Sequence, residues 1–270
     1  MTALKLAPGS RIFSDIDGTC SEHVDIPANA EIVPAFLAAS RAYHQKYPGQ
    51  FIYVTGRDAQ DAEKMINTDP GSLRLPFLAS HGAVYVDDSG KRHALDYTDQ
   101  EMRFIRKIHE ETIGFLETLP EIETVYDVKD NAGMNQLSYD GLNKGHRAVN
   151  STLVDLKHDG VVLYFKFIED AGLRRDLVEK AIRHLSGLCE SGDNPALRED
   201  LKKFQDLSGQ TSSFALKIET EDQIEIRGPH TKGSALHAHG LIENDKDSNC
   251  AAFVDTLGKY GTDRALAEAV

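Results

Sequence analysis

A short β-prone run that ends in two aspartates and a glycine constrains the fold more than any other stretch. It covers residues 11–19 and reads Arg-Ile-Phe-Ser-Asp-Ile-Asp-Gly-Thr. Side chains at i and i+2 of a strand point the same way, so we expect Asp15 and Asp17 to share one side. Gly18 allows a sharp turn at the carboxyl end of the strand, where open α/β sheets hold their ligands. The stretch therefore predicts a reactive site at a sheet edge.

The paired carboxylates indicate a bound cation. Two carboxylates close together repel each other, so such a pair usually holds a cation between them or carries one proton. We expect Mg²⁺, which prefers oxygen ligands. A strand end whose aspartates cap the next turn is the structural alternative. A metal-dependent glycosyltransferase, which also uses an Asp-X-Asp pair, is the alternative within enzymes.

Length and composition are typical of a soluble globular protein. The 270 residues, of which 40% are hydrophobic and 27% charged, allow one large domain or two modest ones. The first ten residues lack a basic segment followed by an apolar run, and apolar stretches such as 161–165 are too short to span a bilayer. We therefore expect a cytoplasmic protein without a membrane partner, and a monomer is our working expectation.

Charge and cysteine usage narrow the partners further. The formal net charge of -13 disfavours nucleic acid and anionic membranes, because both are bound through basic patches. Cys20, Cys189 and Cys250 are widely separated and odd in number, which argues against a disulfide framework or a zinc site. Cys20 lies close to the predicted site, but no histidine partner can be placed beside it, so we do not predict a cysteine nucleophile.

The first hundred residues alternate strand and helix. Apolar periodicity and turn residues predict a helix within 28–47 that begins near Pro34, a buried strand at 51–54, a helix at 58–67, a strand at 77–80 and a hairpin that starts at 84–86. The tail returns to this pattern with a helix from Thr231 through Ile242, a polar loop at 243–249 and a buried strand at 251–254. This order predicts a doubly wound parallel sheet.

The middle of the chain has a different pattern. Residues 99–119 predict one long amphipathic helix. After it we expect strands at 124–128, 135–139 and 161–168, helices at 146–156, 173–188 and 195–207, and a hairpin from 214–219 and 223–227. We therefore expect a Rossmann-like α/β core of residues 1–92 and 228–270 with an inserted α+β cap domain, residues 93–227, for substrate specificity.

Four polar segments follow buried strands or open a helix. They are Asp15-X-Asp17, Thr55-Gly-Arg57, Lys232 and Asp255. Phosphoryl transfer through an aspartyl-phosphate needs these residue types, since it requires a carboxylate nucleophile, an acid/base, donors for the phosphoryl oxygens and acidic metal ligands. The set therefore predicts phosphoryl-transfer chemistry.

The order and spacing of these segments resemble the haloacid dehalogenase superfamily of phosphatases, with the middle block as a cap between the second and third motifs. The resemblance implies that Asp15 is the nucleophile, and that Asp17 protonates the departing sugar oxygen and later activates water. It implies that Thr55 binds a phosphoryl oxygen and that Lys232 neutralises charge there. Mg²⁺ would be held by Asp15, the Asp17 carbonyl and Asp255.

Within that superfamily the chain looks most like the trehalose-6-phosphate phosphatases, over most of its length. Three segments carry this likeness: Thr55-Gly-Arg57, Ser80-His81-Gly82 and Ile224-Glu225-Ile226-Arg227-Gly-Pro-His-Thr-Lys232-Gly233. By this resemblance Glu225 binds sugar hydroxyls. The substrate-binding residues implied beside it are Gly56, Arg57, His81 and Lys129, the last from a segment, Asp127-Val-Lys129, that is loosely similar to a cap Glu-X-Lys segment.

The fourth motif departs from the family pattern. The family usually has Gly-Asp-Asp followed closely by Thr-Asp, whereas this chain has Asp255 at the strand end and a longer loop before Asp263. Asp263 is therefore a second candidate, which shares or replaces the metal-binding role of Asp255. The histidine-tyrosine-arginine segment of the family's cap is not matched.

Simpler structural roles remain open for each motif. Thr55 or Asp58 can cap the helix that follows, and Arg57 can be an ion-pair partner rather than a ligand. Lys232, taken alone, reads as a surface lysine. His237 and His239 do not face each other on a helix, so we interpret them as solvated or packed side chains.

The sequence thus predicts a Mg²⁺-dependent hydrolase of carbohydrate metabolism that converts a small-molecule sugar phosphate, trehalose 6-phosphate, to trehalose and phosphate in trehalose biosynthesis. Alternative substrates are sucrose 6-phosphate, mannosyl-3-phosphoglycerate and hexose phosphates. A non-catalytic sugar-phosphate binding protein with a degenerate fourth motif is the alternative outside the enzymes.

Overall fold

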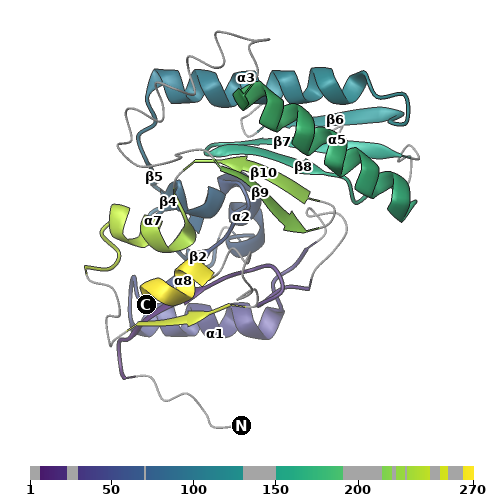
Figure 1. Ribbon diagram of the computed structural model, residues 1–270. Coiled ribbons are helices and arrows are strands. Elements are labelled where there is room, and N and C mark those ends of the chain that lie inside the picture. The colour runs from purple at the N-terminus through teal and green to yellow at the C-terminus, as the bar shows by residue number, and fades with distance from the viewer. Residues whose placement is uncertain are drawn as a thin grey trace. The chain divides into compact units, whose positions relative to one another are not determined.

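The computed structural model describes residues 7–22, 30–69, 71–129, 150–190, 215–220, 223–228, 230–243, 250–254 and 264–270 (Figure 1). The chain divides into two compact units, Met1–Leu95 with His230–Val270, and Asp96–Pro229. The sequence places these boundaries at 92/93 and 227/228, whereas the structure divides the chain at 95/96 and 229/230. Each unit is described by itself below.

The first unit is built on a sheet that has six strands within the described residues, in the order β11-β1-β2-β3-β4-β5. β1 pairs in parallel with both β11 and β2, and β2 pairs in parallel with β3. β4 and β5 continue the sheet as an antiparallel hairpin. The strands are β1 (Arg11–Ser14), β2 (Phe51–Val54), β3 (Phe77–Ala79), β4 (Val84–Val86), β5 (Arg92–Ala94) and β11 (Cys250–Phe253).

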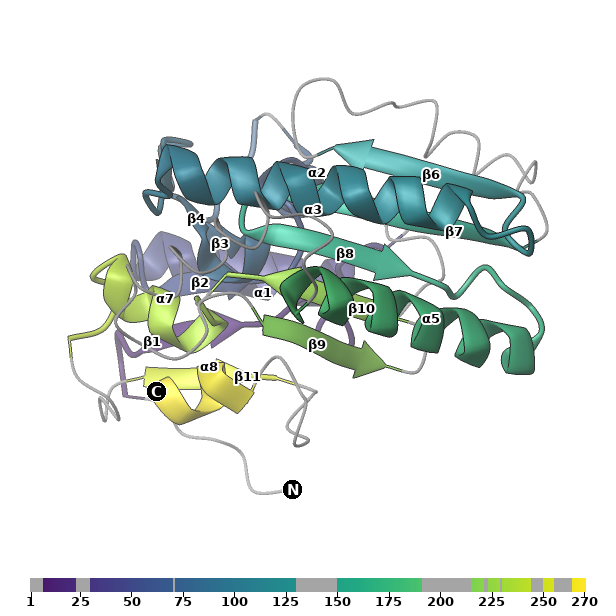
Figure 2. The ribbon, with the colours of Figure 1, turned by 45° about the horizontal axis from the view of Figure 1, so that its top comes forward.

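Helices cover both faces of this sheet, because the parallel strands are apolar on both sides. Side chains that alternate along the strands pack with α1 (Pro34–Lys46) and α2 (Ala59–Ile66) on one face. On the other face they pack with α7 (Lys232–Ala238) and α8 (Arg264–Ala269), as Figure 2 shows. Pro34 stands in the first turn of α1, where its missing N–H costs no helical hydrogen bond. The predicted doubly wound core is confirmed.

The second unit has a sheet of the order β6-β7-β8-β10-β9 within the described residues. β6 and β7 are parallel and the other pairs are antiparallel. The strands are β6 (Thr124–Lys129), β7 (Ser151–Lys157), β8 (Gly160–Tyr164), β9 (Ala215–Thr220) and β10 (Gln223–Arg227). α3 (Asp99–Glu117) and α5 (Ala171–Glu190) pack on one face of it, around a common apolar core (Figures 1 and 2).

The helix predicted at 146–156 is wrong, because residues from Ser151 onward form strand β7. Val154 and Leu156 pack into the core shared with α3 and α5, while Asp155 alternates with them. Pairing with β6 on one side and β8 on the other stabilises the extended form. The alternation of apolar and polar residues in β7 is too short to predict a strand by itself, and pairing with β6 and β8 determines the extended conformation.

Other differences are smaller. The helix that opens after Thr231 ends at Ala238 instead of Ile242, since Gly240 has a left-handed φ of 66° that ends it. The strand predicted at 161–168 ends at Tyr164. The short helix α8 was not predicted. The strand predicted at 135–139 and the helix predicted at 195–207 lie outside the described residues.

In the part of the chain that the structure describes, no helix combines the length and the apolar character needed to cross a membrane.

Candidate active site

Asp15 and Lys232 form a buried ion pair. Lys232 Nζ donates to Asp15 Oδ1 at 2.6 Å, and the two side chains are 4% and 5% exposed. Asp15 lies just beyond β1, where its amide donates to the carbonyl of Phe253 at 3.0 Å. A charge buried this deeply must be paired, because an isolated charge loses its hydration without compensation. Each residue therefore requires the other.

The first turn of α7 holds the lysine in place. Thr231 caps the helix: its Oγ1 accepts from the Ser234 amide at 3.1 Å, and Ser234 Oγ accepts from the Thr231 amide at 2.9 Å. Lys232 is the first helical residue after this cap and is itself buried. The reading of Lys232 as a surface lysine is therefore wrong.

A tight turn follows Asp15. The carbonyl of Ile16 accepts from the amides of Thr19, Cys20 and Ser21 at 3.2, 2.9 and 2.9 Å. Gly18 has φ of 78°, a left-handed conformation that favours glycine, as the predicted sharp turn requires. Several hydrogen bonds thus fix the loop that carries the aspartates.

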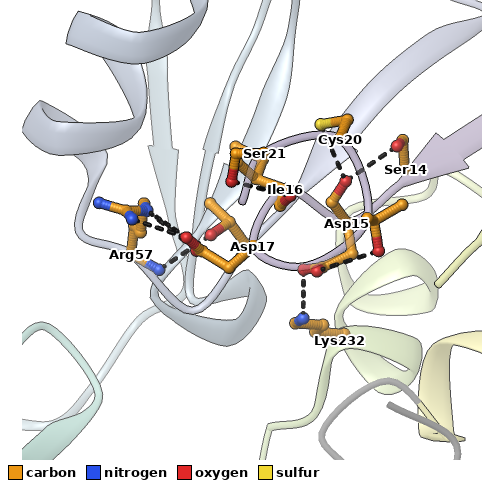
Figure 3. A network of polar contacts seen from close by, with 10 residues as sticks. Ser14, Asp15, Ile16, Asp17, Cys20, Ser21, Arg57 and Lys232 are labelled. Carbon is orange, nitrogen blue, oxygen red and sulfur yellow. Dashed lines mark hydrogen bonds and ion pairs between the residues drawn. The ribbon is translucent and has the colours of Figure 1, made fainter. Parts of the chain in front are cut away.

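Asp17 forms an ion pair with Arg57 rather than with Lys232. Arg57 Nε donates to both carboxylate oxygens of Asp17, at 3.2 and 2.9 Å, and Arg57 Nη2 donates to Oδ1 at 2.6 Å. Figure 3 shows Asp15 directed toward Lys232 and Asp17 directed toward Arg57. The premise that strand alternation sets both aspartates is wrong, because β1 ends at Ser14 before either of them.

Thr55 is the first residue after β2, in the loop that also carries Arg57. The Thr55 amide donates to the carbonyl of Leu78 at 2.8 Å, and its buried Oγ1 accepts from the Arg57 amide at 3.1 Å. Asp58 caps α2 by accepting from the amides of residues 60 and 61 at 2.7 and 2.9 Å. Of the two capping candidates in the sequence, Asp58 is the N-cap residue.

The turn after β3 packs against this loop. Ser80, His81 and Gly82 all have positive φ, at 48°, 54° and 99°. The His81 amide donates to the carbonyl of Thr55 at 3.0 Å, and its ring lies against Gly56. A Cβ at Gly56 would stand 2.6 Å from His81 Cε1, closer than atoms can approach. Close approach therefore explains the glycine.

The same turn contacts α7. A Cβ at Gly82 would stand 2.1 Å from the Cβ of Ala235. His239 Nε2 lies 2.8 Å from the Gly82 carbonyl, and burial lowers the pKa of His239. His239 is therefore a packed side chain. Three polar segments that are far apart in sequence, after β1, after β2 and at the start of α7, are thus held together.

Cys20 lies beside Asp15 but has the wrong chemistry for a nucleophile. Its Sγ donates to the Asp15 carbonyl at 3.4 Å. Burial, and then the negative charges of Asp15 and Asp17, raises the pKa of the Cys20 thiol to about 12. The thiolate, which is the reactive form, is therefore suppressed.

Three polar residues, Asp155, Lys157 and Glu225, share one face of the second unit's sheet. Asp155 in β7 and Glu225 in β10 are both register partners of Val162 in β8, the strand between them. Strand neighbours of Glu225 at 224 and 226 pack in the core with α3 and α5, so Glu225 lies on the opposite face. Lys157 pairs with Asp155 at 3.7 Å.

The sequence analysis does not include Asp155 and Lys157, because it predicts a helix over 146–156. The alternation of apolar and polar residues from Val154 to Lys157 is the signal that identifies them. Gln223 Nε2 donates to Glu225 Oε1 at 2.9 Å on the same face. Lys129 is the last residue of β6, and its side chain is outside the described structure.

The metal ligands are only partly described. Asp15 and Asp17 supply carboxylate and carbonyl oxygens, which is the donor chemistry that suits Mg²⁺. Asp255 and Asp263 lie outside the described residues. Among the residues that the structure describes, no group of three or more His, Cys, Asp or Glu side chains is gathered as a metal site. The donors that are described fit Mg²⁺ in type.

Comparisons with known proteins relate the chain to solved structures. No family model matches it, and no curated protein does. It is similar to the C-terminal domain of Candida albicans trehalose-6-phosphate phosphatase, with a TM-score of 0.53 and 17% identity over 87% of this chain. It is similar to the C-terminal domain of Candida albicans trehalose synthase regulatory protein, with a TM-score of 0.51 and 12% identity over 86% of this chain.

A third match is to Plasmodium falciparum IMP-nucleotidase, with a TM-score of 0.50 and 10% identity over 98% of this chain. The chain spans 63%, 61% and 64% of these three structures, less than two thirds of each. At such identities the likeness concerns the fold. The resemblance predicted from the motifs is confirmed at that level: the chain has a Rossmann-like α/β fold, which it shares with the trehalose-6-phosphate phosphatase domain.

Proposed function

We propose that this protein is a Mg²⁺-dependent phosphatase that hydrolyses a sugar phosphate through an aspartyl-phosphate at Asp15. The buried pair of Asp15 and Lys232 is the observation that carries the proposal. A carboxylate that is fixed at the carboxyl end of a central strand, beside a buried ammonium group, is arranged for attack on a group that bears negative charge. Trehalose 6-phosphate is our first substrate candidate.

In the first step a carboxylate oxygen of Asp15 attacks phosphorus, and the bond from phosphorus to the sugar oxygen breaks. Asp17, in its protonated form, gives its proton to that departing oxygen. In the second step Asp17 takes a proton from water, whose oxygen attacks phosphorus and releases Asp15 and inorganic phosphate. Acid–base help of this kind contributes about 10²–10⁴-fold to rate.

Fixed donors stabilise the charge that develops on the phosphoryl oxygens. Lys232 supplies an ammonium group that is held by the start of α7, and Thr55 supplies a hydroxyl on a loop pinned to β3. Preorganised donors cost little reorganisation during the reaction, and removing one typically slows an enzyme by about 10²–10³-fold. Asp15, the Asp17 carbonyl and Asp255 would hold Mg²⁺, which supplies Lewis-acid charge when bound.

We assign the phosphate chemistry to the first unit and the choice of sugar to the second. The support is chemical: Asp155, Lys157 and Glu225 present carboxylate and ammonium groups on one sheet face, and such groups bind sugar hydroxyls. Lys129 stays a proposed contact of the substrate, as do Gly56 and His81. Within this proposal 93–227 acts as the cap.

Release of inorganic phosphate from a panel of sugar phosphates tests the proposal. The panel holds trehalose 6-phosphate, sucrose 6-phosphate, mannosyl-3-phosphoglycerate and hexose phosphates, each measured with Mg²⁺ and with a chelator. Release that needs Mg²⁺ supports the phosphatase, and the best substrate names the sugar. No release from any member would reject it.

The same assay separates the alternatives. A non-catalytic sugar-phosphate binding protein is the alternative outside the enzymes, and one structural neighbour has the name of a regulatory protein. Binding of trehalose 6-phosphate by calorimetry without Mg²⁺-dependent hydrolysis identifies that case. A glycosyltransferase would bind a nucleotide sugar, and the buried Lys232 would then have no task in its chemistry.

A further inference from the structure

We propose that Arg57 is a positioning residue for the acid–base group Asp17, and not a ligand of the substrate's phosphate. The inference rests on the proposed function, in which Asp17 transfers the proton. It revises the substrate-binding role that the family resemblance suggested for Arg57.

The first observation is the geometry of the pair. Nε and Nη2 form one edge of the guanidinium group, and Asp17 accepts from both. A planar fork that matches a carboxylate in this way fixes its orientation as well as its charge. A phosphate bound in bidentate fashion needs the same edge. Arg57 would have to release Asp17 before it could bind phosphate through that edge.

The second observation is how firmly Arg57 is held. Its amide donates to Thr55 Oγ1 at 3.1 Å, and its carbonyl accepts from the Ser80 amide at 2.7 Å. Its side chain is 9% exposed, against 33% for Asp17. The buried, anchored member of the pair is therefore the arginine, and the aspartate is the member with access to solvent and to a substrate.

The third observation is that Asp17 lies beyond the end of β1. β1 ends at Ser14, three residues before Asp17, and Asp17 makes an isolated bridge with Ser21 in the turn that follows. The turn fixes the backbone of Asp17, and Arg57 orients its carboxylate from the next loop. A misplacement of a catalytic group by about 1 Å can cost about 10²-fold in rate.

A double-mutant cycle in the full chain tests this. Turnover of the best sugar phosphate is measured for Arg57→Gln, Asp17→Asn and the double variant. We expect Arg57→Gln to lower kcat by about 10²-fold, and the double variant to be no slower than Asp17→Asn, because both remove the same function. A further loss in the double variant would show that Arg57 acts independently of Asp17 and would overturn the inference.

A second readout separates positioning from phosphate binding. Inorganic phosphate is the probe, and its inhibition constant is measured for each variant. Positioning predicts an inhibition constant within about twofold of wild type for Arg57→Gln, whereas loss of a charged phosphate ligand weakens phosphate about 10-fold or more. If the inhibition constant of phosphate rose in Arg57→Gln by the same factor by which kcat fell, the inference would also be overturned.

A third readout uses the leaving group. With p-nitrophenyl phosphate the departing phenolate needs no proton, so the first step does not require the acid. Arg57→Gln should still release one equivalent of phenolate rapidly and then turn over slowly, since the second step needs Asp17 as base. If Arg57→Gln lost both the rapid release of phenolate and the slow turnover, positioning would be contradicted.

Two controls exclude a purely structural effect. Arg74→Gln removes a similar ion pair, Arg74 Nη2 to Glu63 Oε1 at 2.8 Å, away from the site, and should leave turnover unchanged. If Arg57→Gln unfolds in a thermal melt, Arg57→Lys keeps the charge without the fork and replaces it in the cycle. If the wild type releases no phosphate, the proposed function is rejected. If the wild type is active and the losses in kcat of Arg57→Gln and Asp17→Asn add in the double variant, the inference alone is rejected.

Discussion

Lys232 Nζ lies 2.6 Å from Asp15 Oδ1, although the two residues are 217 positions apart along the chain. The pair joins the first turn of α7 to the loop after β1, so the proposed nucleophile is complete only when the two ends of the first unit have come together. The pair is therefore a constraint on folding as well as the centre of the proposed active site.

The nucleophile is tested by Asp15→Asn. An amide cannot form the aspartyl-phosphate, so phosphate release should fall below detection while the variant keeps its circular dichroism spectrum. Asp88→Asn, at a carboxylate whose side chain is 51% exposed, is the matched control and should retain wild-type turnover. Persistent turnover by Asp15→Asn would refute the covalent route.

The buried pair is tested through stability. Lys232→Ala leaves the Asp15 carboxylate buried without its cation, and breaking such a pair typically costs about 3–5 kcal/mol. Urea unfolding should show this loss for Lys232→Ala and much less for the exposed Lys64→Ala, whose ion pair with Asp61 is 3.7 Å long. Equal losses in the two variants would show that Asp15 and Lys232 are not coupled.

Gly56 is tested for close approach to His81. In Gly56→Ala the new Cβ would lie 2.6 Å from His81 Cε1, so the loop that carries Thr55 must shift, and we expect turnover to fall by about 10²-fold. Gly114→Ala in α3 is the matched control, with nothing within 4 Å of the added atom and a gain of about 1 kcal/mol in helix stability.

The role of His81 in that effect can be separated. Adding His81→Ala to Gly56→Ala opens the space that the methyl group needs, so part of the lost turnover should return. Failure of the second substitution to restore any activity would show that the ring is not the obstacle.

Glu225 is tested for sugar binding. Glu225→Gln replaces an anionic acceptor that makes strong hydrogen bonds to hydroxyl groups, so KM for the sugar phosphate should rise by about 10-fold or more. The effect on an aryl phosphate, which has no sugar, should be smaller. Glu179→Gln on α5, with a carboxylate that is 58% exposed, serves as the control. An equal effect on both substrates would remove Glu225 from the sugar site.

Cys20 gives a prediction for pH dependence. Its pKa is raised from 9.0 to about 12 in the folded protein, so the folded state keeps the proton more tightly than the unfolded state does. The stability this contributes is present below pH 9 and is lost as pH rises from 9 toward 12, by up to about 1.4 kcal/mol per pH unit. Urea unfolding in a chelator at pH 8 and pH 10.5 measures it.

Cys20→Ala removes that dependence, so the variant should lose less stability than wild type over the same pH range. Equal losses of stability in the variant and the wild type would show that the pKa of Cys20 is not raised in the folded protein. As a second check, iodoacetamide at pH 8 should modify the partly exposed Cys250 before the buried Cys20, read by peptide mass mapping.

Elements of both units could be predicted where their signals are local. Phe51 to Val54 is a short apolar run followed by a glycine turn, and β2 lies there. Thr98 and Glu101 form a capping box at the start of α3, which agrees with the predicted amphipathic helix. Periodicity and turn residues determine such elements without help from distant contacts.

What could not be predicted depends on distant contacts. β7 contains residues that are compatible with a helix, and pairing with β6 and β8 makes it a strand. In the site, the residue types Asp15, Asp17, Arg57 and Lys232 were readable, but their pairing was not. Which cation faces which carboxylate is set by loops that meet only in three dimensions.

The central position of β1 bears on how the protein is made. Its parallel neighbour β11 begins at Cys250, so the strand beside the proposed nucleophile is translated after the whole second unit. The second unit is one continuous segment, Asp96–Pro229, and can gather its core while the ribosome still holds the C-terminal strand. Lys232 also follows the second unit in the chain, so Asp15 can acquire its buried cation only after residues 96–229 have been synthesised.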